Sequence, residues 1–100
     1  MIKHIVFWKL KEEASGNDKA LNARMIKEKL EVLNGQIPGL LKLEVGIDFS
    51  QTEMSYDVAL YSEFANKADL KLYDEHPLHV AVKSFVKEVN CSRTVVDYEI

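Results

Sequence analysis

One hundred residues suffice for one globular domain, and a content of 47% hydrophobic and 29% charged residues is ordinary for such a domain. A formal net charge of −3, with 13 Lys and Arg residues spread along the chain, excludes the basic surface that nucleic-acid binding requires. The apolar runs are too short to cross a bilayer, so we expect no membrane contact.

Cys91 is the only cysteine, which rules out an internal disulfide. The chain also enters a strand pattern directly, without a signal-type segment. Both features favour the reducing cytoplasm as the location of the protein. Because Cys91 borders an apolar strand and has no activating neighbour in sequence, we expect a buried structural thiol rather than a nucleophile.

Residues 2–10 are rich in β-branched and aromatic side chains and predict a strand. Ile5 and Phe7 point to one face of this strand. The residues on the other face are Ile2, His4, Val6, Trp8 and Leu10. A strand that is apolar on both faces must be covered on both, which predicts a layer beyond the domain's own helices.

A helix is predicted next, from about Asp18 to Asn34, after a sequence at Ser15–Asp18 that resembles a capping box. One apolar stripe consists of Ile26, Leu30, Leu33 and Ile37. Gly35 supplies the helix stop and Pro38-Gly39 turns the chain.

Two strands follow, at residues 40–48 and 56–64, and an antiparallel hairpin is the simplest way to join them. In the first of these strands, the residues expected on one face are Leu41, Leu43, Val45 and Ile47.

The chain continues with a short helix that starts near Asn66 and breaks at His76-Pro77, where a second helix begins. The apolar stripe expected for this second helix is Leu78, Val82, Phe85 and Val89. Residues 91–100 predict a last strand, with Thr94, Val96, Tyr98 and Ile100 on one face.

The order of these elements predicts one α+β domain over residues 1–100, with a ferredoxin-like β-α-β-β-α-α-β plan and a four-stranded antiparallel sheet. In this plan the helices cover only one face of the sheet. The other face carries too many apolar groups to remain in water, so we expect a homodimer through that face.

The sequence Tyr73-Asp-Glu-His76-Pro77-Leu-His79 is the candidate functional site. His79 falls in the first turn of a helix, where we expect the helix dipole and Lys83 to lower the pKa of the imidazole. A neutral imidazole can serve as a base and a tyrosine hydroxyl as a hydrogen-bond donor to an oxyanion. The alternative is structural: His76 caps the helix, His79 lies at the edge of the core and Tyr73 contributes its ring to packing.

We predict neither a metal site nor a cofactor. His76 and His79 have a His-x-x-His spacing, but no carboxylate or cysteine stands at an established ligand spacing, and His4 is the only other histidine. The chain has no glycine-rich phosphate loop and no Gly-x-Ser-x-Gly nucleophile motif.

The chain resembles the stress-responsive A/B barrel (Dabb) family of the dimeric α+β barrel superfamily. The segments that carry the resemblance are Lys3–Val6, Ile37–Gly39, the Tyr73-x-x-His76-Pro77-x-His79 motif and Val96-x-Tyr98. The resemblance implies a homodimer in which two four-stranded sheets form a barrel, with a cleft between helices and sheet in each subunit.

Two functions follow from this resemblance. The first is binding of a small molecule near Tyr73 and His79, with further contacts from His4, His76 and Trp8 and no established reaction. The second is a cofactor-independent enzyme acting on a small carbonyl compound, either a polyketide cyclase-like aldol cyclisation or a monooxygenase-like reaction. In the cyclase-like reaction His79 would be the base and Tyr73 would stabilise the carbonyl oxygen. We favour binding, with catalysis as the alternative, because a shared fold hosts unrelated activities.

Overall fold

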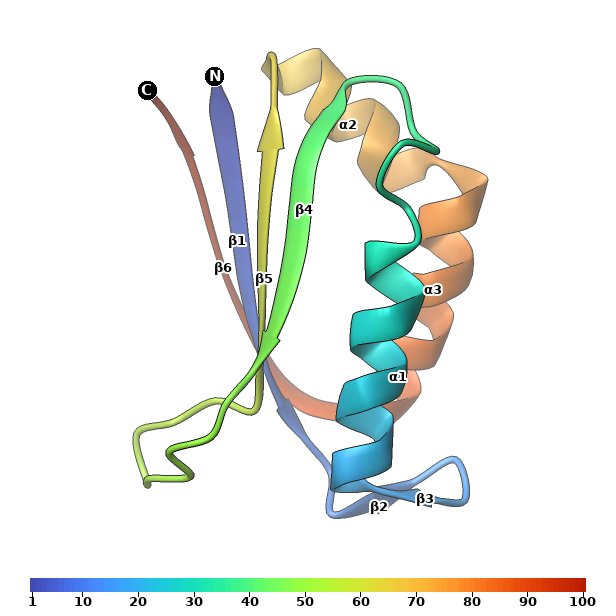
Figure 1. Cartoon of the computed structure of the whole chain (residues 1–100), viewed down its shortest axis with the longest axis vertical. Helices are drawn as coiled ribbons and strands as arrows, with labels where there is room; N and C mark the ends of the chain where they lie inside the picture. The colour runs from blue at the N-terminus through green and yellow to red at the C-terminus, as the bar shows by residue number, and fades with distance from the viewer.

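The computed structural model describes all residues from Met1 to Ile100 and contains a four-stranded antiparallel sheet in the order β4-β5-β1-β6 (Figure 1). The strands of this sheet are β1 (Ile2–Leu10), β4 (Leu40–Ile47), β5 (Val58–Phe64) and β6 (Asn90–Glu99). The helices are α1 (Lys19–Glu31), α2 (Lys67–Glu75) and α3 (Pro77–Val89), and all three lie on one side of the sheet (Figure 1). The predicted ferredoxin-like α+β fold is confirmed.

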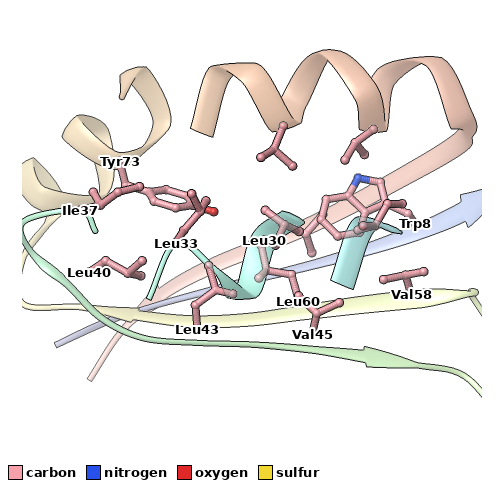
Figure 2. Packing of buried hydrophobic residues seen from close by; sticks show 14 of the residues in the cluster. Trp8, Leu30, Leu33, Ile37, Leu40, Leu43, Val45, Val58, Leu60 and Tyr73 are labelled. Carbon is pink, nitrogen blue, oxygen red and sulfur yellow. The ribbon is translucent and has the colours of Figure 1, made fainter. Parts of the chain in front are cut away.

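The predicted alternation of β1 is also confirmed. Its five residues at even positions, Ile2, His4, Val6, Trp8 and Leu10, are buried against the helices, while the residues between them are half-buried. The core formed on this side includes residues from β1, β4, β5 and α1, and Figure 2 shows Trp8, Leu30 and Leu60 projecting into it.

The start of α1 differs from the expected capping box. Asp18 is the N-cap, and its carboxylate accepts a hydrogen bond from the Leu21 N–H at 2.8 Å. Ser15 instead joins β2 (Glu13–Ala14) to β3 (Asn17–Asp18), together with Gly16. Both turn residues have positive φ, 53° and 78°, which is the pattern of a type I′ hairpin turn. The tight hairpin therefore prevents Ser15 from capping the helix.

The helix α1 ends at Glu31, three residues before the expected end, and Leu33 and Ile37 are nevertheless buried in the turns that follow. Gly35 adopts a φ of 79°, a left-handed conformation that favours glycine. The apolar stripe expected of the helix is thus completed by the connecting loop.

In β4, the buried residue at the start of the strand is Leu40 and not Leu41, which is 56% exposed. The pairing register with β5 shifts between Leu40 and Lys42, so a bulge moves the alternation by one residue. Leu43 and Val45 are buried as expected, while Ile47 at the strand end is 41% exposed.

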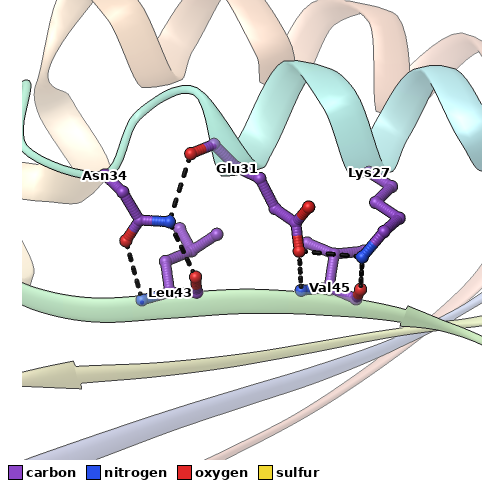
Figure 3. A network of polar contacts seen from close by, with 5 residues as sticks. All are labelled: Lys27, Glu31, Asn34, Leu43 and Val45. Atoms are coloured by element: carbon purple, nitrogen blue, oxygen red, sulfur yellow. Dashed lines mark hydrogen bonds and ion pairs between the residues drawn. The ribbon is translucent and has the colours of Figure 1, made fainter.

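The edge of β4 that faces away from β5 is covered by side chains of α1 and the following turn (Figure 3). Asn34 accepts a hydrogen bond from the Leu43 N–H at 3.0 Å and donates to the Leu43 carbonyl at 2.8 Å. One turn back, Glu31 accepts from the Val45 N–H at 3.1 Å and Lys27 donates to the Val45 carbonyl at 2.6 Å. These bonds occupy backbone groups that an edge strand otherwise leaves open to another chain.

The buried stripe of α3 is also rotated relative to the expected one. It consists of His79, Val82, Val86 and Val89, whereas Leu78 is exposed and Phe85 is half-buried. The helix packs against both α1 and α2, and these two contacts orient it. The apolar periodicity of the sequence alone is compatible with either of these two neighbouring stripes.

The sheet face opposite the helices carries the cross-strand pairs Ile5–Val96 and Phe7–Thr94. No helix covers this outer face, and Val96 is 50% exposed. Thr94, Val96 and Tyr98 lie on this one face as expected, since they pair with outward-facing residues of β1.

Cys91 is exposed, so the expectation of a buried thiol is wrong. It lies at the irregularity between the Lys9–Ser92 and Leu10–Asn90 pairs, where the bulge turns one residue of β6 away from the core. None of the helices combines the length and the apolar composition that a membrane-spanning helix needs.

Candidate functional site

A cleft of about 490 Å³ lies between α3 and the helix-facing side of the sheet. Its inner wall is apolar and consists of Val6, Trp8, Leu30, Leu60, Val82 and Val86. His4 and His79 also line it, as do the charged residues Asp74, Lys83, Lys87 and Arg93. We call this space the α3 cleft.

Two periodicities bring these residues together. Alternation along β1 directs His4, Val6 and Trp8 to the same side of the sheet. Spacings of three and four along α3 direct His79, Val82 and Val86 toward them. Most of the residues that line the α3 cleft therefore come from one face of β1 and one face of α3.

His76 lies at the joint between α2 and α3 and does not line the α3 cleft. Its backbone is extended, with φ −64° and ψ 134°, as expected for a residue before proline. Its Nδ1 accepts a hydrogen bond from the Leu78 N–H at 3.1 Å, so the side chain caps α3. His76, one of the five candidate site residues predicted from the sequence, thus caps the helix and lies outside the cleft.

His79 is buried, and its Nδ1 lies 3.3 Å from the backbone carbonyl oxygen of Asp74. Because a carbonyl oxygen only accepts, Nδ1 carries the proton in this contact and Nε2 keeps its lone pair. Burial lowers the pKa of His79, and the nearby Lys83 charge acts in the same direction, while the bond to Asp74 opposes it. The pKa of His79 is thus lowered as expected, but the main cause is burial rather than the helix dipole.

Tyr73 is fully buried, and its ring stacks on His79 with the centroids 4.0 Å apart and an interplanar angle of 27°. The ring lies among the apolar side chains near Leu33 and Ile37 (Figure 2). The hydroxyl has no hydrogen-bond partner, and burial raises the pKa of Tyr73 above its ordinary value. Tyr73 therefore holds the His79 ring in place and does not itself line the α3 cleft.

His4 reaches the same end of the cleft from β1, and its ring packs edge-on against Tyr73 with the centroids 6.4 Å apart. Its Nδ1 bonds to the carboxylate of Asp97, the residue opposite His4 on β6. The sheet register thus sets the orientation of this imidazole and leaves Nε2 as the nitrogen without a partner.

The charged groups of the cleft divide into paired and unpaired ones. Lys83 donates to the Asp74 carboxylate at 3.0 Å, and this bond lowers the pKa of Asp74. Lys87 and Arg93 form no ion pair and no hydrogen bond through their side chains. Sequence reasoning missed both cations, although strand alternation, which sets Arg93 on the same face of β6 as Asp97, was a signal that could have found Arg93.

An antiparallel sheet with three helices on one face and a cleft under the last helix defines a ferredoxin-like α+β domain. Residues 2–100 match the family model of the stress responsive A/B barrel domain, Dabb. The chain belongs to this family.

Two relatives are similar over almost the whole chain. An uncharacterized protein of Streptomyces coelicolor is 31% identical over 99 residues, which covers 99% of each chain. A dimeric protein of unknown function and ferredoxin-like fold from Bacteroides fragilis is 39% identical, with a TM-score of 0.88 over 99% of this chain and 95% of that one.

An enzyme shares the fold at lower identity. The hydroxynitrile lyase from Passiflora edulis is 21% identical, with a TM-score of 0.77 over 99% of this chain and 92% of that one. At this identity the likeness concerns the fold alone, and function does not follow from a shared fold.

Proposed function

We propose that this protein binds a small organic molecule in the α3 cleft. The observation that carries the proposal is the cleft itself, whose volume of about 490 Å³ lies within the usual range of ligand sites. Its inner wall is apolar and polar side chains converge on it, a combination that ligand sites use to hold and orient a molecule.

Each lining group has a role in this proposal. Trp8 and the neighbouring valines contact the apolar part of the ligand, while the free Nε2 of His79 accepts a hydrogen bond from it. His4 offers a second imidazole, which packs against the same Tyr73 ring on which His79 stacks. Tyr73 acts indirectly, because its stacked ring fixes the plane of His79.

Native mass spectrometry of freshly purified protein tests the proposal. We expect an added mass on the wild-type chain that disappears in Val82→Phe, because the new ring fills the cleft from α3. The control is Val80→Phe, which adds the same ring at an exposed position of the same helix and is expected to keep the added mass. A clean chain mass for the wild type, or retention of the ligand by Val82→Phe, would contradict the proposal.

A second candidate is favoured by the tautomer of His79. With Nδ1 bonded to the Asp74 carbonyl and a lowered pKa, His79 presents an unprotonated Nε2 suited to abstracting a proton α to a carbonyl. This is the first step of a cofactor-independent reaction on a small carbonyl compound, as in an aldol cyclisation. The Tyr73 hydroxyl, by contrast, is enclosed and does not reach the cleft.

Deuterium exchange into β-diketones, followed by NMR in heavy water, tests this second candidate. We expect His79→Gln to abolish any exchange above the buffer rate and His76→Gln to preserve it, since His76 lies outside the cleft. Equal exchange rates for the wild type and His79→Gln would eliminate His79 as the base.

We also propose that the chain forms a homodimer through its outer sheet face and works in the cytoplasm. The exposed apolar side chains on that face, Val96 and Tyr98 among them, support the first point. The dimeric state of the Bacteroides fragilis relative is consistent with it. The single exposed thiol of Cys91 supports a reducing compartment.

A further inference from the structure

The mouth of the α3 cleft lies between α3 and the edge strand β6 and carries cations on both sides. Lys87 stands on the helix side and Arg93 on the strand side, and both are exposed. The apolar wall behind them is buried, with Val6 at 1% and Leu60 at 2% exposure. Cationic groups therefore flank the opening of a space that is apolar inside.

The acidic groups near the mouth do not neutralise these two cations. Asp74 is the only acidic residue that lines the cleft, and Lys83 already pairs with it at 3.0 Å. Asp97, further along β6, bonds to His4 and forms no ion pair with either cation. Two positive charges thus remain at the mouth without an internal counter-ion.

Geometry keeps both cations at the opening rather than elsewhere on the surface. Arg93 pairs in register with Trp8, so its side chain leaves β6 on the helix-facing side, next to the indole that lines the cleft. Lys87 lies one helical turn after Lys83, on the same side of α3. A guanidinium and an ammonium on opposite sides of one opening suit a carboxylate or a similar acidic group.

We propose that the α3 cleft selects a small amphipathic anion, whose apolar body enters the cleft and whose acidic group lies between Lys87 and Arg93. This inference rests on the proposed binding function and adds the chemical class of the ligand. A neutral molecule of the same shape contacts the apolar wall equally well but leaves both cations without a partner.

Two fluorescent probes with the same aromatic body test the proposal. One is 8-anilinonaphthalene-1-sulfonate, and the other is N-phenyl-1-naphthylamine, which lacks the sulfonate. We expect the wild type to bind the sulfonate roughly tenfold more tightly than the neutral probe at low salt, and this advantage to shrink at high salt. Titrations are run on the wild type and on Lys87→Gln, Arg93→Gln and the double variant.

Each single substitution is expected to weaken sulfonate binding roughly threefold, the effect of one exposed charge contact, and to leave the neutral probe unchanged. The matched control is Arg24→Gln, which removes an exposed charge from α1 outside the cleft and is expected to change neither affinity. Val82→Phe is expected to abolish binding of both probes, which locates them in the cleft rather than on the outer sheet face. Melting curves establish that each variant is folded.

The outcomes separate the two proposals. If both probes bind equally, or if the double variant keeps the full affinity for the sulfonate, the selection of anions is refuted while binding in the cleft stands. If neither probe binds, or if Val82→Phe binds both as the wild type does, the binding function itself is contradicted.

Discussion

The Tyr73 hydroxyl is the one buried side-chain polar atom of the chain that has no hydrogen-bond partner. Leaving such a group unpaired in an apolar environment costs about 1–3 kcal/mol, so stability alone does not account for it. A tyrosine at this position gains the stacking on His79, which a phenylalanine ring would also provide.

We therefore expect Tyr73→Phe to leave the free energy of unfolding unchanged or to raise it by about 1 kcal/mol, because the substitution removes an unpaired hydroxyl. Urea denaturation measures the change. Tyr61→Phe is the control, since it removes a hydroxyl that donates to Glu63 at 2.5 Å and is expected to be neutral or slightly destabilising. A loss of more than about 1 kcal/mol in Tyr73→Phe would mean that the hydroxyl has a stabilising partner.

The buried imidazole of His79 makes stability depend on pH. Its folded-state pKa lies below the ordinary value of 6.5, so below that pH the unfolded chain binds more protons than the folded one. The contribution of His79 is complete above about pH 6.5 and is lost as the pH falls toward the folded-state pKa. Asp74, Lys83 and His4 are the charged or titratable neighbours that modulate this loss.

In His79→Gln the side chain does not titrate, so we expect a flatter decline in melting temperature as the pH falls below about 6.5. His76→Gln serves as the comparison, because it changes a histidine outside the cleft. Parallel pH profiles for wild type and His79→Gln would remove His79 as the source of the dependence.

At the scale of elements, the protection of the β4 edge depends on side chains rather than on another strand (Figure 3). Asn34 is central to it, because its amide bonds both the N–H and the carbonyl of Leu43 and also donates to the Glu31 carbonyl at 3.1 Å. Beside it, the hydrogen bonds from Lys27 and the Val45 N–H lower the pKa of Glu31. The contact joins the end of α1 to the edge strand.

We expect Asn34→Ala to lower the free energy of unfolding by about 1–2 kcal/mol, since three hydrogen bonds at a half-exposed site are lost. Gln36→Ala, in the same loop and without a side-chain hydrogen bond, should change stability by less than about 0.5 kcal/mol. Denaturant unfolding measures both, and light scattering at high concentration reports whether the uncovered edge promotes association. Equal stability of the two variants would show that the edge contact contributes nothing.

At the scale of the whole molecule, adjacent residues of β6 point to opposite faces of the sheet, one to the outer face and the next to the side of the cleft. Val96 pairs with Ile5 on the outer face, whereas Val95 pairs with Val6 on the helix-facing side. The two valines are similarly exposed, at 50% and 41%. Only the outer face is expected to be covered by a second copy.

Light scattering after size-exclusion chromatography should accordingly report about twice the 11.4 kDa chain mass for the wild type. We expect Val96→Lys to shift the protein to the monomer, because a lysine in the centre of the interface carries an unpaired charge. Val95→Lys places the same charge on the other face and should remain dimeric. A dimeric Val96→Lys variant would exclude the outer face as the interface.

Local signals in the sequence predicted much of the fold. Alternation identified both faces of β1, and Asn66 and Pro77 marked where two helices start. The motif at residues 73–79 contains Tyr73 and His79, whose rings stack in the structure. These features depend on the chain within a few residues, which is why propensity and periodicity report them.

The sequence by itself thus determined the order of the four sheet strands and the three helices, the apolar outer face and the motif at the joint of α2 and α3, but not the β2–β3 hairpin. Only the tertiary structure decided that Leu40 rather than Leu41 is buried, that Cys91 is exposed, and that His76 caps a helix while His79 faces a cleft. It also decided that Arg93 and Lys87 both line that cleft. These outcomes depend on a bulge, on the rotation of α3 and on strand register, and each of them is set by contacts between segments distant in the chain.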